Sequence, residues 1–251
     1  MGDRLILILG YGAVFVSTAL WVGHHFWFHD RRMARAAWGG GVLAVLLLAG
    51  GVVAYGFRVG YRPFHTAYEL LNVGLLGLLS VSLAFLSPRR DGRLLTILSV
   101  VASLVAAYGL WASGPAVPAV FVYDSGWWIA YAILSGFGGG ATVVTGVAAV
   151  AACRRRGQDS RGENIVAQRA LAWGLLTLSA GLASGMWWFH RLSGRYWGDA
   201  RWACVAIVGL LAAAAWHVRQ EWLGRGWRSA LVGTILGFSG GYVLLGLGCG
   251  G

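Results

Sequence analysis

Six histidines are the side chains of this chain best suited to hold a metal ion or a haem iron. Relative to the expected membrane spans, they form two groups. Those near the inner ends of spans are His24, His25, His29 and His217, and those near the outer ends are His65 and His190. Two histidines on facing helices are how a helix bundle ligates a b-type haem. The alternative is that each imidazole hydrogen-bonds to headgroups or carbonyls, and His29, beside Asp30, fits that role best.

A second concentration of functional side chains lies at residues 185–202, which read GMWWFHRLSGRYWGDARW. An aromatic belt at the membrane surface accounts for roughly two or three Trp or Tyr residues, but not for this density. A flat, apolar, anionic ligand accounts for it better, because aromatic faces stack on rings and guanidinium groups pair with carboxylates. Haem, with its propionates, fits this description, and a quinone headgroup fits less well because it lacks the anions. The expected contacting residues are Trp188, Trp197, Trp202, Arg195, Arg201 and Asp199.

Glu69 is a carboxylate expected about one turn inside a membrane span. A charge at that depth is costly and must be paired, protonated or close to water. Arg58 and Arg62, in the preceding connection, are its natural partners. A structural salt bridge therefore explains Glu69 at least as well as a catalytic role. A transporter is disfavoured, because the sequence has no internal repeat and no matching pair of broken helices.

Composition places these residues in a membrane protein. Of the 251 residues, 58% are hydrophobic and 12% are charged, with a mean hydropathy of +0.66. Soluble domains have roughly a quarter charged residues, and disordered chains lack such apolar content, so both classes are excluded. The net charge of +11 comes from arginine without lysine, in short runs between apolar stretches. That pattern is typical of membrane-protein loops and disfavours a nucleic-acid partner.

Eight apolar runs are long enough to cross a bilayer, whose core of about 30 Å needs roughly 20 residues per helix. They cover residues 4–24, 38–57, 65–87, 93–112, 126–152, 168–190, 202–219 and 229–248. The connections are short, so we expect one transmembrane domain over residues 1–251, an all-α polytopic bundle of about eight helices. The glycine pairs Gly136/Gly140, Gly181/Gly185 and Gly237/Gly241 are expected to serve helix packing only.

The distribution of arginines predicts the orientation. With the N-terminus outside, fourteen arginines lie in inside connections and six in outside ones. Because positive residues favour the inside, both termini are expected outside. The cysteines form no CxxC or CxxCH motif, which excludes zinc-knuckle, thioredoxin-type and covalent haem-attachment motifs. Cys204 and Cys249 are expected on the same, oxidising side, where a disulfide between them is chemically allowed.

Residues 185–202 resemble the tryptophan-rich outside loop of the cytochrome c assembly family, the CcsA-type haem-handling membrane proteins. That loop follows the pattern G-x-x-W-x-x-x-x-W-G-x-Y-W-x-W-D-P-K-E. Gly185, Trp188, Gly194, Tyr196 and Trp197 match it without a gap, and Asp199 matches after a one-residue deletion. Further matches, in the family's order, are Gly60, Pro63, Tyr68 and Glu69; Val117-Pro118-Ala119; His217-Val218-Arg219; and Gly226-Trp227-Arg228.

The resemblance implies a haem-binding protein of the bacterial cytoplasmic membrane, in which His217 ligates haem iron. It implies that haem is presented at the outside loop and joined to the CxxCH motifs of apocytochromes. If the protein is catalytic, it is then a haem lyase-like component without an acid–base residue of its own, because positioning two reactants can supply the rate. The expected partners are other membrane subunits, the lipid bilayer and a c-type cytochrome at the outer face.

Two histidines of the family pattern are missing. The stretch 123–130, where the family has an outside axial histidine, contains none, and Gly246-Leu247-Gly248 stands where the family has Gly-Leu-His. His65 and His190 are candidates to replace that pair, while His24 or His25 with His217 would hold haem inside. One or two non-covalent b haems are expected. The alternative is a subunit of a respiratory electron-transfer complex that carries b haem, or has kept the fold without any.

Overall fold

The computed structural model describes the backbone of residues 2–59, 67–111, 126–153, 161–194, 200–223 and 226–246. Side chains are described for residues 5–54, 71–111, 126–153, 161–194, 203–223 and 226–244. The elements in chain order are α1 (Gly2–Gly23), the π-helical turn η1 (His24–Phe28), α2 (Arg31–Val59), α3 (Ala67–Phe85), α4 (Gly92–Trp111), α5 (Gly126–Cys153), α6 (Arg161–Ser193), α7 (Ala200–His217), α8 (Arg219–Trp222) and α9 (Trp227–Gly246).

Each of the eight expected spans corresponds to one long helix, so the prediction of an all-α polytopic membrane bundle is confirmed. The described ranges contain no β-strand. Within them, five stretches are long and apolar enough to cross a membrane: Leu5–Phe28, Arg31–Ala54, Gly92–Trp111, Gly126–Cys153 and Arg161–Ser193. Leu71–Phe85 and Ala203–His217 are shorter apolar helices. Large apolar side chains such as Leu104, Leu210 and Phe238 are exposed on the surface, as lipid contact requires.

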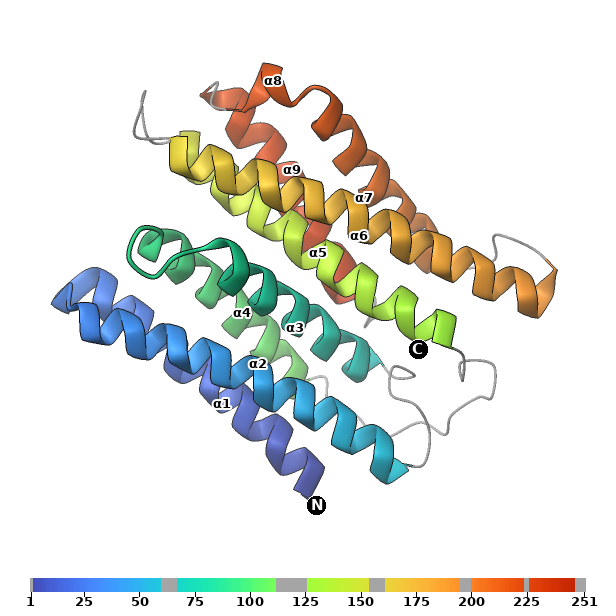
Figure 1. The fold of residues 1–251 in the computed structure, drawn as a ribbon, viewed down its shortest axis with the longest axis horizontal. Helices are drawn as coiled ribbons and strands as arrows, with labels where there is room; N and C mark the ends of the chain where they lie inside the picture. The colour runs from blue at the N-terminus through green and yellow to red at the C-terminus, as the bar shows by residue number, and fades with distance from the viewer. Residues whose placement is uncertain are drawn as a thin grey trace.

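The long helices run alternately up and down along one direction (Figure 1). α1 and α2 pack together at one side, α3 and α4 lie in the middle, and α5, α6, α7 and α9 form the other side. The first residues of α1 and the last of α9 lie at the same end (Figure 1), as an even number of passes requires. We name the end where α1, α3, α5 and α7 finish the inner end, and the opposite one the outer end.

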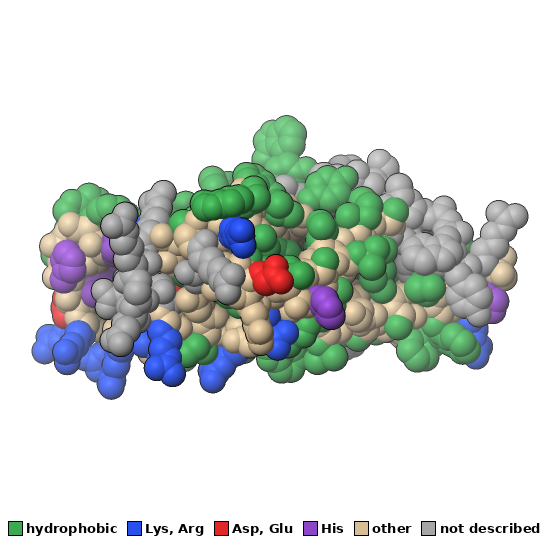
Figure 2. All heavy atoms as spheres, turned by 90° about the horizontal axis from the view of Figure 1, so that it is seen from above, with side chains coloured by type: hydrophobic (Ala, Val, Ile, Leu, Met, Phe, Trp, Pro, Cys, Tyr) green, Lys and Arg blue, Asp and Glu red, His purple; other side chains and the backbone are tan. Residues whose placement is uncertain are grey.

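The inner end carries most of the described arginines. Arg31, Arg32, Arg89 and Arg90 are exposed there, which agrees with the arginine distribution expected of cytoplasmic connections. Figure 2 shows most of the visible arginine side chains along one edge of the bundle, with apolar side chains over much of the remaining surface.

Glycine allows α5 to approach two other helices very closely. A Cβ on Gly77 of α3 would lie 2.6 Å from the carbonyl oxygen of Gly136, and a Cβ on Gly140 would lie 2.6 Å from the backbone nitrogen of Leu78. On the other side, a Cβ on Gly233 of α9 would lie 2.8 Å from the Cβ of Ala149. The packing role predicted for the Gly136/Gly140 pair is therefore confirmed. Backbone-to-backbone contact of this kind is how small residues join helices in membranes.

Candidate functional site

The inner end of α7 brings an imidazole, an indole and a guanidinium together. The helix ends at His217, Val218 adopts φ −96° and ψ 18°, and the chain turns into α8. The Arg219 guanidinium lies 4.3 Å from the centroid of the Trp216 ring and donates a hydrogen bond to the Trp216 carbonyl at 3.1 Å. The His217 ring is exposed and has no hydrogen-bond partner among the described residues. Its nitrogen atoms are therefore available to a ligand at the surface of the bundle.

A buried indole holds this turn in place. Trp222 of α8 is 2% exposed, and its Nε1–H donates to the carbonyl oxygen of Ala215 at 2.8 Å. This bond ties α8 back onto the last turn of α7 and so fixes Arg219 beside Trp216. The break after His217 was not predicted from the sequence, because residues 202–219 form one continuous apolar run.

The other inner histidines lie on η1, which continues α1. π-helical turns are rare and occur frequently at functional sites. The His24 ring lies 6.0 Å from the Trp21 ring and 6.3 Å from the His29 ring, centroid to centroid. His24 Nδ1 is buried and has no hydrogen-bond partner within the described part of the chain. The turn closes where the His29 N–H donates to the His24 carbonyl at 3.0 Å, with His29 in the left-handed region at φ 48°.

Three consecutive aromatic rings of η1 point away from the bundle. Phe26, Trp27 and Phe28 are 66%, 71% and 67% exposed. Aromatic side chains are enriched at the membrane–water boundary. Exposed rings at this end of the bundle are therefore what is expected of a turn near a membrane–water boundary.

The structure does not bring His24 or His25 together with His217. α1 packs against α2 and α4, whereas α7 packs against α6 and α9. The two helices lie on opposite sides of the bundle (Figure 1). The two inner histidine groups are therefore separate candidates for ligand binding, and a bis-histidine haem shared between α1 and α7 has no support in this arrangement.

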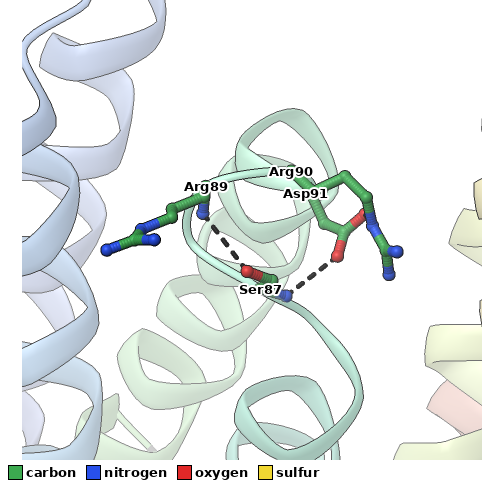
Figure 3. Close-up of polar contacts among 4 residues, drawn as sticks. All are labelled: Ser87, Arg89, Arg90 and Asp91. Carbon is green, nitrogen blue, oxygen red and sulfur yellow. Dashed lines mark hydrogen bonds and ion pairs between the residues drawn. The ribbon is translucent and has the colours of Figure 1, made fainter.

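A short turn between α3 and α4 positions the start of α4 at the inner end (Figure 3). Asp91 is 7% exposed, and its Oδ2 accepts a hydrogen bond from the Ser87 N–H at 2.8 Å. Its Oδ1 accepts a longer bond from Arg90 Nε at 3.3 Å, and its backbone carbonyl accepts the Leu95 N–H that begins α4. The buried carboxylate thus closes the turn and sets where the next residues, including Arg93, emerge. From the sequence alone, Arg93 is only one of the arginines of the inside connections.

At the outer end, the first turn of α5 and the last turns of α6 form an aromatic cluster. Trp128 packs against Trp188 with ring centroids 4.9 Å apart, and against Tyr131 at 5.2 Å. Trp128, Tyr131 and Trp188 are 3%, 0% and 6% exposed. Trp188, expected to stack on a ligand, is instead packed inside the bundle. Its partner on α5 was not identified from the sequence, although the Trp127-Trp128 doublet was the available signal.

Among the described tryptophans of the outer end, Trp111, Trp127 and Trp187 are exposed. Trp127 and Trp187 lie 6.3 Å apart, centroid to centroid, and both are exposed. The Arg191 guanidinium carbon lies 5.8 Å from the Trp187 centroid. His190, on the same turn of α6, is half-buried. Trp187 and Trp127 are therefore among the exposed ring faces that a ligand at the outer end would meet.

Several expected site residues lie outside the described part of the chain. These are His65, Arg195, Trp197 and Asp199, together with Arg62 and Cys249. Arg201 and Trp202 belong to the first turn of α7, and Glu69 to the first turn of α3, but their side chains are not described. Cys204 is a half-buried free thiol with its Sγ 3.9 Å from the Tyr242 hydroxyl.

Comparisons with known proteins relate the fold of this chain to that of a solved structure. No family model matches the chain, and no curated protein matches it. Among solved structures, a protein described as "Cytochrome c Heme Lyase CcmF" aligns with a TM-score of 0.65 and 19% identity, over 98% of this chain and 50% of that one. This chain therefore spans about half the length of that protein. The cytochrome c assembly-type resemblance of the sequence is confirmed at the level of the fold.

Proposed function

We propose that this chain is a haem-binding membrane protein of cytochrome c assembly, which holds haem in the bilayer and presents it at the outer face. The observation that carries the proposal is the exposed imidazole of His217 at the end of α7, in a chain whose fold matches a cytochrome c haem lyase over 98% of its length. The family pattern places its membrane haem ligand at this position. The proposed location is the bacterial cytoplasmic membrane.

The residues around His217 suit such a ligand. An imidazole nitrogen ligates haem iron, and the His217 ring is exposed without a hydrogen bond to another described residue. Arg219 and Trp216 offer a cation and an aromatic face within one turn, which match a propionate and a flat ring. Bound haem would supply the iron to be ligated and the ring to be joined to an apocytochrome. The chain itself would bind, orient and present it, a contribution that proximity effects can make large.

The outer end suits the presentation step. Trp127 and Trp187 expose aromatic faces, with Arg191 beside them. Trp187 and Arg191 lie in the last turns of α6, directly before the tryptophan-rich connection that holds Trp197 and Asp199. A c-type cytochrome at the outer face and other membrane subunits of the assembly machinery are the proposed partners.

The first experiment measures haem in the purified full-length protein. Reduced-minus-oxidised spectra and a pyridine haemochrome assay would give the type and amount of haem. We expect b-type haem in the wild type and a content lower by about one haem per chain in His217→Ala. His29→Asn is the matched control, because it removes another exposed imidazole and asparagine tolerates the left-handed backbone found there. Folded wild-type protein that binds no haem when supplied with it would overturn the proposal.

A second candidate function is a subunit of a respiratory electron-transfer complex. The missing histidines in residues 123–130 and at Gly248 favour it, since the family pattern uses them to hold haem outside. The two functions predict different interacting proteins. Co-purification with apocytochrome-handling or thiol-reducing proteins supports assembly, whereas co-purification with multihaem cytochromes and iron–sulfur subunits supports the respiratory complex.

A further inference from the structure

A hollow of about 690 Å³ lies on the bundle surface between α1 with η1 on one side and α4 on the other. Its volume falls within the range of roughly 300–1,000 Å³ typical of small-molecule sites. Aliphatic and aromatic side chains form most of its wall, together with one imidazole and one guanidinium. The lining residues are Val22, His25, Phe26, Arg93, Ile97 and Val100, with Thr96 and Val101.

Arg93 is a half-buried cation that the bundle leaves without a counter-charge. It has no hydrogen bond or ion pair among the described residues. It lies in the first turn of α4, which contains no acidic residue, and the positive end of the helix dipole disfavours a cation there. The nearest acidic side chain in sequence, Asp91, is bonded to the Ser87 N–H and to Arg90. An anionic group in the hollow would therefore relieve an electrostatic cost.

His25 supplies the second polar group of the hollow. Its ring is half-buried and packs edge-on against Phe26 with centroids 5.0 Å apart. Like Arg93, it has no hydrogen-bond partner within the described ranges. A neutral imidazole in apolar surroundings is a good iron ligand. The wall thus combines an iron ligand, a cation and an apolar surface.

We infer that this hollow binds a haem-type tetrapyrrole, with His25 as an axial ligand and Arg93 paired with a propionate. The choice of ligand rests on the proposed function, but the site is separate from His217. A phospholipid tail would also fit the apolar wall, and its headgroup would pair with Arg93. It would leave the imidazole without a role, however. A second hollow, of about 610 Å³ between α4, α5 and α9, shares Arg93 but has no histidine in its lining, and suits a lipid tail better.

The test examines the contact of His25 with iron and the contact of Arg93 with a propionate separately. Each variant is measured with a ligand that carries the group in question and with a ligand that lacks it. The experiment uses the full-length His217→Ala protein in nanodiscs. This variant lacks the haem ligand proposed at the end of α7, so that only ligand binding at the hollow is measured. The ligands are haemin, metal-free protoporphyrin and the dimethyl ester of protoporphyrin, each titrated by absorption and by quenching of tryptophan fluorescence. Protoporphyrin lacks the iron, and its ester lacks the carboxylates as well.

Adding His25→Ala should weaken haemin binding by about tenfold or more and leave protoporphyrin binding unchanged, because only iron needs the imidazole. Adding Arg93→Ala should weaken protoporphyrin binding by about tenfold and leave its ester unchanged, because only the free carboxylate pairs with the guanidinium. Arg93→Lys should restore part of that loss. His29→Asn and Arg89→Ala, which remove an imidazole and a guanidinium outside the hollow, should change neither affinity.

Three results would overturn the inference. The first is that haemin binds to the wild type but not at all to His217→Ala. This result would leave the proposed function intact. The second is unchanged binding of all three ligands in His25→Ala and Arg93→Ala. The third is a loss of co-purified anionic phospholipid in Arg93→Ala without any change in porphyrin affinity, which would assign the hollow to a lipid. Wild-type protein that binds no haemin at all would overturn the proposed function as well.

Discussion

At the outer end of the bundle, Trp128, Tyr131 and Trp188 pack on one another and are buried. At the inner end, His25, Arg93 and His217 lie at the surface or beside a hollow, and none of them has a hydrogen bond or an ion pair with another described residue. Aromatic rings are stabilised by packing on one another. An imidazole or a guanidinium in apolar surroundings is stabilised when a ligand provides a hydrogen-bond or ionic partner. The buried cluster at the outer end is thus committed to packing, whereas the inner end holds polar side chains that can bind a ligand.

This difference limits what aromatic density alone can indicate. Residues 185–202 stood out in the sequence as a ligand-binding segment. In the structure, the first two tryptophans of that segment lie on different faces of α6. Trp188 packs against α5, and Trp187 is exposed. Adjacent residues on a helix point about 100° apart, so that one of this pair packs inside the bundle while the other is exposed.

The largest expected effect is a loss of stability when a ring is removed from the buried cluster of Trp128, Tyr131 and Trp188. Trp128→Ala should lower the free energy of unfolding by about 3 kcal/mol or more, because it leaves a cavity between α5 and α6. Trp187→Ala should lower it by less than about 1 kcal/mol, because that ring is exposed. Unfolding of the purified protein in mixed micelles with increasing SDS measures both values. Equal losses in the two variants would contradict the division into packed and exposed rings.

A smaller effect is expected at the α3–α4 turn. Asp91→Ala removes the acceptor of the Ser87 N–H in a buried site, and should cost about 1–3 kcal/mol. Arg90→Ala should cost less than about 1 kcal/mol, because its side chain is 68% exposed and exposed ion pairs contribute little. The same SDS titration compares the two. If Arg90→Ala matched Asp91→Ala, the ion pair and not the backbone contact would hold the turn.

The smallest effect should be the coupling between Trp127 and Trp187. A double-mutant cycle of Trp127→Ala and Trp187→Ala should give an interaction free energy of about 0.5–1 kcal/mol, as expected for an edge-to-face pair. A coupling well above that range would mean that the exposed rings belong to the packed cluster. In that case neither ring would be available to a ligand at the outer face.

The positions of the helices could be predicted from the sequence because bilayer thickness fixes the length of an apolar run. A close helix contact at Gly136 and Gly140 was also predicted from their spacing, but not that α3 is the helix in contact. Other features depend on contacts between distant segments. The packing of Trp128 on Trp188 joins residues 60 positions apart, and the hollow lined by His25 and Arg93 needs α1 and α4 to lie side by side. Hydropathy does not determine which helices become neighbours.

The exposed rings of η1 have a consequence for the depth of the protein in the bilayer. Phe26, Trp27 and Phe28 form a continuous aromatic anchor, directly followed by Arg31 and Arg32. Aromatic rings prefer the headgroup boundary and arginines the aqueous side of it, so the two groups together resist vertical displacement of α1 and α2. The hollow lined by His25 and Phe26 lies beside this anchor, so that an amphiphile in the bilayer would reach the polar groups of the hollow without leaving the membrane.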